Sequence, residues 1–264
     1  MSPLLEATRL SIAFGGLRAV QDFNLALEAG DLQGLIGPNG AGKTTVFNLL
    51  TGVYRPDAGE IRLAGQRLDG LRPFQIARAG LARTFQASRL LANLSVADNV
   101  RIGAQLRSRP SLAGTMWRTR RHRDAERDIE ARTQRLLATF GLAERADELA
   151  RHLPYGDQRR LEMARALATQ PRVLLLDEPA AGMNPQEKLA LRELVQRIRR
   201  EFGVTILLIE HDMSVVMSIC ETVTVLDYGV TIARGTPRQV QGDPRVIEAY
   251  LGVAAPPGGP PGDA

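Results

Sequence analysis

The sequence has little cysteine, little lysine and no long apolar run. Its single cysteine, Cys220, excludes an internal disulfide in a chain of 264 residues and fits a reducing cytoplasm. The longest apolar stretches, at 173–176 and 204–209, are far shorter than the roughly 20 residues that span a bilayer. The opening MSPLLEATRL has no basic segment followed by a long apolar one. We therefore expect neither a membrane-spanning helix nor a secretory signal.

The net charge of +5 raises the possibility of a nucleic-acid or membrane-surface partner. Only Lys43 and Lys188 are lysines among 34 basic residues, so the charge reflects an arginine bias that is spread along the chain. One dense cluster, RTRRHR at 118–123, lacks the interleaved aromatic residues that favour single-strand binding. We interpret it as a solvated face, leave a phosphate-binding role open, and expect no nucleic-acid partner.

Periodicity predicts an α/β protein with an N-terminal antiparallel β layer. Apolar residues alternate with polar ones at 10–14 and 23–27, as in half-buried strands. The apolar runs at 173–176 and 204–209 are separated by a helical stretch at 185–202, as parallel strands with a crossover helix would be. A strand after Asp31 precedes a glycine-rich turn and then a helix whose predicted apolar face is Val46, Leu49, Leu50 and Val53.

The strand pattern disappears between about Ala87 and Pro154, where we predict a helical subdomain. We place it at about 87–156 within a single domain of residues 1–252 whose core is about 1–86 and 157–235. VTVLDYGVTI predicts a hairpin that turns at Tyr228 and Gly229, and short helices are expected at about 236–252. The Pro- and Gly-rich residues 253–264 predict a flexible tail.

A phosphate-binding loop is predicted by GPNGAGKTT, which follows a strand and precedes a helix. Glycines let successive backbone N–H groups point at phosphate oxygens, and the helix N-terminus adds positive charge. Lys43 would contact the β- and γ-phosphates of ATP, Thr44 would offer its hydroxyl to Mg²⁺, and Thr45 would bind a further phosphate oxygen. The predicted binding residues are Gly37, Pro38, Asn39, Gly40, Ala41, Gly42, Lys43, Thr44 and Thr45.

Two acidic residues follow the buried strand in VLLLDEP at 173–179. Asp177 is the expected acidic partner of the metal ion. Glu178 can polarise a water molecule for attack on the γ-phosphate, which predicts a hydrolase rather than a nucleotide switch. The alternative is that Glu178 only caps the loop that follows.

Five motifs in order carry a family resemblance: GPNGAGKTT, RTFQ, LPYGDQRRLEMARAL, LLLDEPAAGMNP and LLIEHDM. The chain resembles the ATPase subunits of ABC transporters over about residues 4–252. The resemblance implies a P-loop NTPase core of the ABC type with ATP and Mg²⁺ as ligands. It also implies a role for Phe14 as the aromatic that stacks on adenine. Gln86 would be the Q-loop glutamine, whose amide oxygen can reach Mg²⁺ or the attacking water, and His211 would be the switch histidine that contacts the γ-phosphate. The alternatives are a buried strand residue, a surface glutamine and a structural histidine, respectively.

The signature motif departs from the family pattern Leu-Ser-Gly-Gly-Gln. Pro154 and Tyr155 replace serine and glycine, and Asn184 stands where the family usually has aspartate. The resemblance implies that the signature contacts the ATP of an opposite subunit, through the helix N-terminus and its backbone N–H groups. The residues assigned to this contact are Tyr155, Gly156, Asp157 and Gln158.

These departures, together with AAGMNP and the ending VIEAYLG, resemble the ATPases of branched-chain amino acid importers. The resemblance implies a peripheral subunit on the cytoplasmic face of the cell membrane, which couples ATP hydrolysis to solute uptake. The expected partners are two permeases, a second related ATPase subunit and, indirectly, a binding protein; a homodimer also stays open. We expect permease docking near Gln86 through Leu90, Leu91, Leu94 and Val96, with internal packing as the alternative.

Other functions stay open from the sequence alone. The transported solute could be urea, an amide or another amino acid, because it never touches this subunit. The ATPase of a lipopolysaccharide-export complex has similar motifs, although its signature more often retains Ser-Gly-Gly. A soluble ABC ATPase that acts on ribosomes or DNA would fit the basic composition, but neither a second ATPase half nor a long coiled-coil insert is visible.

Overall fold

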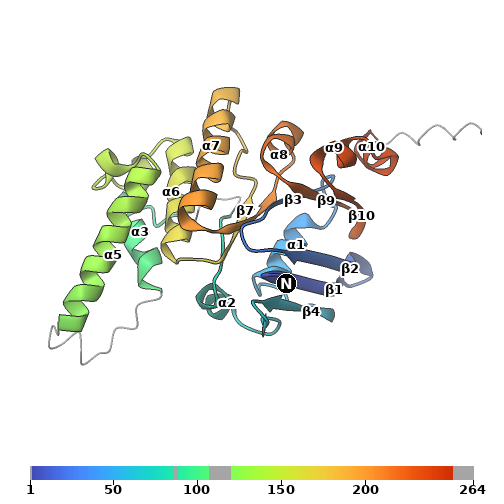
Figure 1. The fold of residues 1–264 in the computed structure, drawn as a ribbon, viewed down its shortest axis with the longest axis horizontal. Coiled ribbons are helices and arrows are strands. Elements are labelled where there is room, and N and C mark those ends of the chain that lie inside the picture. The colour runs from blue at the N-terminus through green and yellow to red at the C-terminus, as the bar shows by residue number, and fades with distance from the viewer. Residues whose placement is uncertain (1, 86–88, 107–119, 252–264) are drawn as a thin grey trace, which may run out of the picture.

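Two sheets form the framework of the computed structural model, which describes residues 2–85, 89–106 and 120–251 (Figure 1). The first sheet is antiparallel and has the strand order β2–β1–β4–β5. Its strands are β1 (Leu5–Phe14), β2 (Leu17–Leu27), β4 (Ala58–Leu63) and β5 (Gln66–Arg67). The predicted N-terminal antiparallel layer is therefore confirmed.

The second sheet has the order β10–β9–β3–β8–β7–β6, and all of its neighbours are parallel except β9 and β10. Its strands are β3 (Leu32–Ile36), β6 (Leu81–Arg83), β7 (Val173–Asp177), β8 (Thr205–Ile209), β9 (Thr222–Asp227) and β10 (Val230–Gly235). Parallel strands end at the same edge, so the loops after β3, β6, β7 and β8 open on one side of the sheet. The motifs GPNGAGKTT, RTFQ, LLLDEPAAGMNP and LLIEHDM begin within these strands or directly after them, whereas LPYGDQRRLEMARAL follows no strand of this sheet.

Side-chain alternation divides the core into two clusters, one on each face of the parallel sheet. On β7, Val173 and Leu175 pack with the first sheet, while Leu174 and Leu176 pack with the helices on the other face. Both faces are buried, which is why this strand reads as an uninterrupted apolar run. Helix α1 (Lys43–Leu50) contributes its buried residues to the cluster that lies between the sheets.

Helices α7 (Pro185–Phe202) and α8 (Met213–Ile219) belong to the opposite cluster, and α7 has the predicted bounds. The β9–β10 hairpin turns at Tyr228 and Gly229, as predicted. After it come α9 (Pro237–Gln241) and α10 (Pro244–Leu251), while residues 252–264 lie outside the described part of the chain. Helix α2 (Pro73–Ala79) precedes β6.

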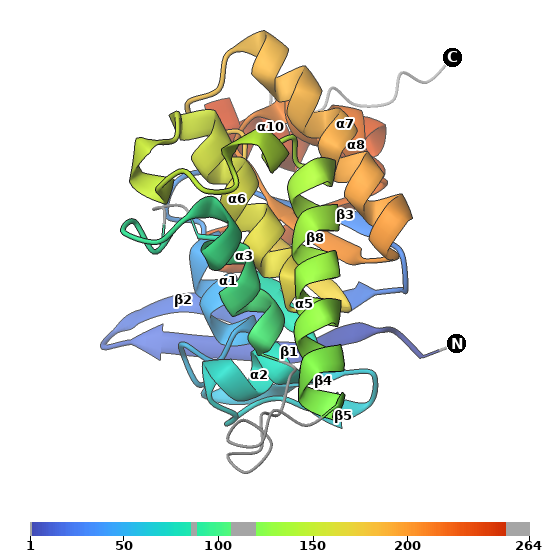
Figure 2. The ribbon, with the colours of Figure 1, turned by 90° about the vertical axis from the view of Figure 1, so that its left-hand side faces the viewer.

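A layer of helices projects to one side of the sheets, as Figures 1 and 2 show. It contains α3 (Val96–Gln105), α5 (Arg120–Thr139), and the short 3-10 helices η1 (Ala143–Arg145) and η2 (Ala150–His152). Helix α6 (Tyr155–Ala168) packs against both α3 and α5, and the boundary predicted after residue 156 falls inside α6. None of the helices in the described ranges is long and apolar enough to cross a bilayer.

One element of the predicted core is wrong. Val53 was expected on the buried face of the helix after the glycine-rich loop, but α1 ends at Leu50 and Val53 is half exposed. The cause is Gly52, whose φ of +70° leads the chain out of the helix. The other three residues of that face, Val46, Leu49 and Leu50, are buried as predicted.

The contact between α3 and α6 gives a stability prediction. A Cβ on Gly103 of α3 would overlap the carbonyl oxygen of Arg165 and lie 3.1 Å from the Cβ of Ala168, both on α6. Gly103→Val should therefore lower the free energy of unfolding by about 1–3 kcal/mol through overpacking, although valine favours a helix more than glycine does. Urea unfolding of the purified chain measures this.

Gly16→Ala is the matched control, because a Cβ at Gly16 meets nothing within 4 Å. A Gly103→Val variant as stable as Gly16→Ala would contradict the close approach of the two helices.

Candidate active site

The loop between β3 and α1 curls in a way that only glycine permits at two positions. Gly37 and Gly42 have φ values of +150° and +102°. A Cβ on Gly37 would overlap the carbonyl oxygen of Leu226, and one on Gly42 would lie 2.6 Å from the carbonyl oxygen of Ala19. The loop therefore fits tightly between β9 and β2, and the start of α1 directs its backbone N–H groups outward.

Lys43 begins α1 and is nearly buried. Its ammonium group donates to the carbonyl oxygens of Gly37 and Pro38 at 2.7 and 2.9 Å. The pKa of Lys43 lies below its usual value, because the effect of burial is larger than that of the negative charges of Glu178 and Asp177, which act to raise it. The lysine and the two acidic residues predicted from separate motifs are thus electrostatic neighbours.

Glu178 follows the end of β7 in a strained conformation. Its φ of +48° is uncommon for a residue with a side chain, and its N–H donates to the carbonyl oxygen of Ile209 at 2.9 Å. The Nδ1 atom of His211 lies 3.7 Å from its Oε2 atom. The fold therefore brings together a carboxylate and an imidazole that are 33 positions apart in the sequence.

Glu210 is a residue of this site that the sequence analysis missed. Its side chain is fully buried, and its carboxylate accepts from the backbone N–H groups of Ala180 at 2.7 Å and His211 at 3.2 Å. Burial raises the pKa of Glu210, opposed by these backbone N–H groups and that of Asp212. The carboxylate ties the loop after Glu178 to the loop that carries His211. The signal in the sequence was a glutamate that extends an apolar strand, LLIE.

Asp212 fixes the loop on the other side of His211. It caps α8 by accepting from the N–H groups of Ser214 and Val215, and it forms an ion pair with Lys188 of α7. These hydrogen bonds, that of Lys188 first, hold the pKa of Asp212 well below its usual range. His211 lies between the two anchored carboxylates, and more than half of its own side chain is exposed.

Thr44 and Asp177 are the residues that could hold a metal ion. Thr44 is exposed at the first turn of α1, and Asp177 is buried at the end of β7. A hydroxyl and a carboxylate are hard oxygen donors, which suit Mg²⁺ that takes its remaining ligands from phosphate groups and water. The donor set fits that ion, and Gln86, the third residue assigned to it, lies outside the described residues.

Phe14 lies at the end of β1 with 45% of its surface exposed, so the alternative of a buried strand residue is wrong. Its ring meets that of Tyr54 edge to face, with centroids 5.1 Å apart. An exposed aromatic face at this position is available for stacking. Its contact with adenine stays a prediction.

Tyr155 begins α6, where the family pattern has a glycine. Its hydroxyl oxygen accepts from Nε and Nη2 of Arg159 at 3.0 and 2.7 Å. The same guanidinium donates to the carbonyl oxygen of Phe85 at 2.8 Å and to Glu162 at 3.1 Å. The tyrosine hydroxyl is thus part of an internal network that joins the start of α6 to the residue before Gln86.

The neighbours of Tyr155 also have internal partners. Oδ1 of Asp157 lies 3.5 Å from Nη1 of Arg160, with which it forms an ion pair. Nε2 of Gln158 donates to the carbonyl oxygen of Leu153 at 2.9 Å. Gly156 has room for a Cβ, whose nearest neighbour would be Glu187 at 3.7 Å. The contact of these residues with the nucleotide of a second subunit stays a prediction.

Asn184, the unusual residue after AAGM, caps α7. Its side chain accepts from the N–H groups of Gln186 and Glu187, and Glu187 accepts from the N–H of Asn184 in return. An asparagine serves this cap as well as an aspartate would. The substitution is therefore compatible with an intact loop.

A groove of about 520 Å³ lies between α2, β6, α3 and α6. Exposed apolar side chains line it, among them Phe74, Leu91 and Ile102. Of the residues expected to dock a permease, Leu91 lies in the groove and Leu94 is partly exposed. Val96 is fully buried in the core between α3 and its neighbours, so its assignment to a docking surface is wrong. Leu90 is partly buried against the same core.

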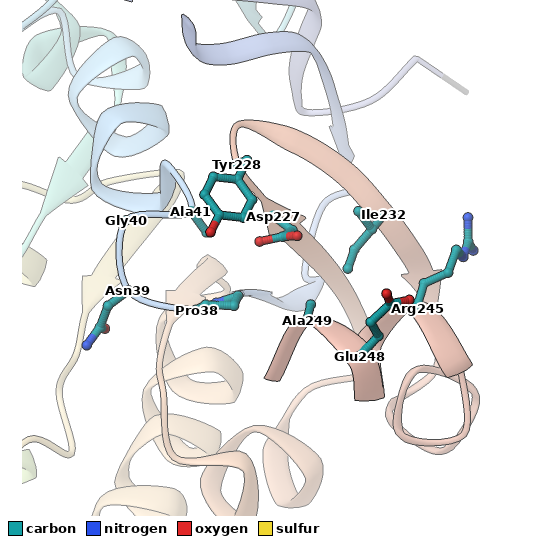
Figure 3. Close-up of a pocket in the computed structure, with 10 residues that line it drawn as sticks. All are labelled: Pro38, Asn39, Gly40, Ala41, Asp227, Tyr228, Ile232, Arg245, Glu248 and Ala249. Atoms are coloured by element: carbon teal, nitrogen blue, oxygen red, sulfur yellow. The ribbon is translucent and has the colours of Figure 1, made fainter. Parts of the chain in front are cut away.

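A second pocket, of about 480 Å³, lies where the phosphate-loop residues meet the β9–β10 turn and α10 (Figure 3). Residues of all three segments line it: Pro38, Asn39, Gly40, Ala41, Asp227, Tyr228, Ile232, Arg245, Glu248 and Ala249. The pKa of Tyr250 on α10 is raised by burial. A hydrogen bond from the backbone of Gly37 acts in the opposite direction and is the smaller effect. The last described helix is therefore in contact with the first glycine of the loop.

Two known families match parts of this chain. Residues 20–181 match the family described as "ABC transporter". Residues 230–256, which include α9 and α10, match the family described as "Branched-chain amino acid ATP-binding cassette transporter". The two matches cover different parts of the chain, and the second contains the helix that contacts the phosphate loop.

Curated relatives match over nearly the whole chain. The high-affinity branched-chain amino acid transport ATP-binding protein LivG of Escherichia coli K12 is 47% identical over 96% of this chain and 99% of its own. BraF of Pseudomonas aeruginosa, with the same description, is 45% identical over the same shares. The lipopolysaccharide export system ATP-binding protein LptB of Escherichia coli is 34% identical over 94% of this chain and 97% of its own.

Solved structures agree with the fold. The ADP conformation of MJ1267, an ATP-binding cassette of an ABC transporter, has a TM-score of 0.82 and 28% identity, and the match covers 96% of this chain and 100% of that one. CbiO1 from Clostridium perfringens, part of the ABC transporter complex CbiONQ, has a TM-score of 0.79 and 25% identity, with 95% of each chain covered.

The buried carboxylate of Glu210 gives a test of how the site is held together. In Glu210→Gln one of the two acceptor oxygens becomes an N–H₂ donor that faces backbone donors. We expect a loss of about 1–3 kcal/mol in the free energy of unfolding, as for a buried group left unsatisfied, and slower ATP hydrolysis because His211 loses its support. Urea unfolding and phosphate release measure the two effects.

Glu193→Gln on the exposed surface of α7 is the control and should behave as the wild type. Wild-type stability and turnover in Glu210→Gln would show that the carboxylate does not hold these loops.

Proposed function

The chain belongs to the ATP-binding subunits of ABC transporters, and on that premise we propose that its ATPase activity powers the import of branched-chain amino acids. The observation that carries the proposal is the 45–47% identity to LivG and BraF over 96% of the chain. LptB, at 34%, is more distant, which favours an importer over the lipopolysaccharide-export alternative. The match of residues 230–256 to a family of branched-chain amino acid transporters supports the same substrate class.

In the proposed hydrolysis, Glu178 is the general base. A carboxylate at the end of β7 can accept a proton from water as the water attacks the γ-phosphate. His211, 3.7 Å from Glu178, would orient that water or the γ-phosphate. Two features hold these groups in place: the strained backbone of Glu178, and the hydrogen bonds that the Glu210 carboxylate accepts from the N–H groups of Ala180 and His211.

Lys43 and the backbone of residues 37–45 would bind the phosphates. The ammonium group would exchange its contacts with the carbonyl oxygens of Gly37 and Pro38 for phosphate oxygens. Thr44 and Asp177 would hold Mg²⁺, which supplies positive charge that stabilises the developing charge on the phosphates. Phe14 would stack on the adenine ring.

A complete site needs a second ATPase subunit. The N-terminus of α6, with Gly156 and the N–H groups of its first turn, would approach the γ-phosphate held by the opposite subunit. Tyr155, whose hydroxyl is bound by Arg159, would shape this contact rather than supply the serine hydroxyl that is absent here. We propose a related but different chain as the second subunit.

The apolar groove between α2 and α3 would receive a cytoplasmic helix of a permease. It presents Phe74, Leu91 and Ile102, and its wall includes Phe85, which adjoins Gln86. An amphipathic helix in such a groove is a common recognition mode. The subunit would therefore lie peripherally at the cytoplasmic face of the cell membrane, with the solute-binding protein in contact only with the permeases.

Hydrolysis is tested by Glu178→Gln. Because the amide fits the site but cannot accept a proton, we expect ATP binding to persist and turnover to fall by at least about 10²-fold. ATP binding by calorimetry and phosphate release by the assembled complex separate the two steps. Glu201→Gln, an exposed residue at the end of α7, is the control; near-normal turnover of Glu178→Gln would remove Glu178 from this role.

Permease docking is tested by Phe74→Glu and Leu91→Glu, which place charge on exposed groove residues. We expect both variants to bind ATP normally and to lose co-purification with the permeases, since desolvating an unpaired charge opposes docking. Val230→Glu is the matched control, because Val230 is similarly exposed but lies on β10 at the opposite edge of the sheet from β6. Normal assembly of both groove variants would contradict the dock.

The substrate class is tested in proteoliposomes that contain the assembled complex. We expect ATP-dependent uptake of labelled leucine, isoleucine or valine when the matching binding protein is present. Uptake of urea or an amide in place of these amino acids would move the proposal to another importer of the same type. Stimulation of ATPase activity by lipopolysaccharide alone would overturn the importer assignment.

A further inference from the structure

Arg83 is a buried cation that neither the sequence motifs nor the proposed mechanism assigns a role. It is the last residue of β6, and its side chain is 5% exposed. Its Nη2 donates to Oδ2 of Asp177 at 2.6 Å, and its Nη1 donates to Oδ1 of Asn48 at 2.7 Å. One guanidinium therefore connects the acidic residue at the end of β7 to α1, the helix that carries Lys43 and Thr44.

The surroundings of Arg83 enforce this geometry. Its guanidinium carbon lies 5.4 Å from the ring centroid of Phe47 and 5.0 Å from that of Phe85. The rings exclude water and favour the cation through their π faces. Asp177 is also fixed through its backbone, whose N–H donates to Oγ1 of Thr84 at 3.2 Å. The side chain and the backbone of Asp177 are thus held by the last residue of β6 and by the residue that follows it.

Stability is a weak explanation for this pair. Burying an arginine and an aspartate costs desolvation energy, which their attraction often only offsets. The Nε–H of Arg83 is buried and has no hydrogen-bond partner among the described residues, which adds to the cost. A cost of this kind is typical of a functional site where a carboxylate must be correctly oriented.

We propose that Arg83 is a positioning residue, which holds the carboxylate of Asp177 in the orientation required by the magnesium–nucleotide complex. Its Nη2–H donates to Oδ2, so that Oδ1 would be the oxygen available to the ion, while its hydrogen bond to Asn48 links β7 to α1. The inference rests on the proposed function of Asp177 and Thr44. Arg83 is not itself proposed as a ligand of the metal ion or of the nucleotide.

Nucleotide binding with and without magnesium tests this role directly. The full-length chain is titrated with a fluorescent ATP analogue, once in EDTA and once in Mg²⁺, and the ratio of the two affinities is the readout. For Arg83→Met, which retains bulk between the two rings, we expect the magnesium-dependent gain in affinity to fall about 10- to 100-fold, the range for partners that orient metal ligands. The affinity in EDTA should stay at the wild-type value.

Two further variants separate charge, geometry and packing. Arg83→Lys keeps the positive charge but cannot reach both Asp177 and Asn48 with one planar group, so it should show a smaller loss of the same kind. Arg89→Met is the matched control, because Arg89 stacks on Phe85 at 4.0 Å, is exposed and has no contact with Asp177. It should keep the wild-type magnesium dependence.

The outcomes are distinguishable. A wild-type magnesium dependence in Arg83→Met overturns the inference, as does an equal loss of affinity in EDTA and in Mg²⁺, which would mark a purely structural residue. If Arg83→Met does not fold, Arg83→Lys decides the question by the same ratio. A wild-type chain that fails to bind the analogue under either condition would instead contradict the proposed function.

Discussion

The parallel pairing of β3, β8, β7 and β6 is the constraint on which the site depends. Because these strands run in the same direction, their carboxyl ends lie at one edge of the sheet. The phosphate loop starts at this edge after β3, Asp177 and Glu178 lie at the end of β7, and His211 follows β8. The strands are buried on both faces, which fixes their register and excludes water from behind the site. A shift of one residue in any of them would turn the core residues to the wrong face.

Buried polar groups convert this edge into a site with defined geometry. Glu210 joins the loop of Glu178 to that of His211, and Arg83 joins Asp177 to α1. Each is a charged group held by two segments that are distant in the sequence. Such groups are costly to bury, and the hydrogen bonds to their partners offset part of that cost. Asp177 and Glu210 are consequently buried among their partners, while Phe14 and His211 are exposed.

Contacts also connect the edge to the surfaces where other chains would bind. Phe85 illustrates this, because its ring lies near Arg83, its carbonyl oxygen accepts from Arg159, and its side chain lines the apolar groove. Arg159 in turn holds the hydroxyl of Tyr155 at the start of α6. The acidic edge, the groove and the signature helix thus share a small set of side chains. On the opposite side, Tyr250 of α10 contacts the backbone of Gly37.

The sequence by itself determined the α/β class, the strands predicted at 173–176 and 204–209, the helix at 185–202 and the presence of the phosphate-binding motif, because periodicity and short motifs are local signals. The structure has the two strands at Val173–Asp177 and Thr205–Ile209. The sequence also identified the family through the order of its motifs. It did not find Glu210 or Arg83, and it placed Val53 and Val96 wrongly. Only the tertiary structure decides such cases, because burial and ion pairing depend on segments that the chain brings together from distant positions.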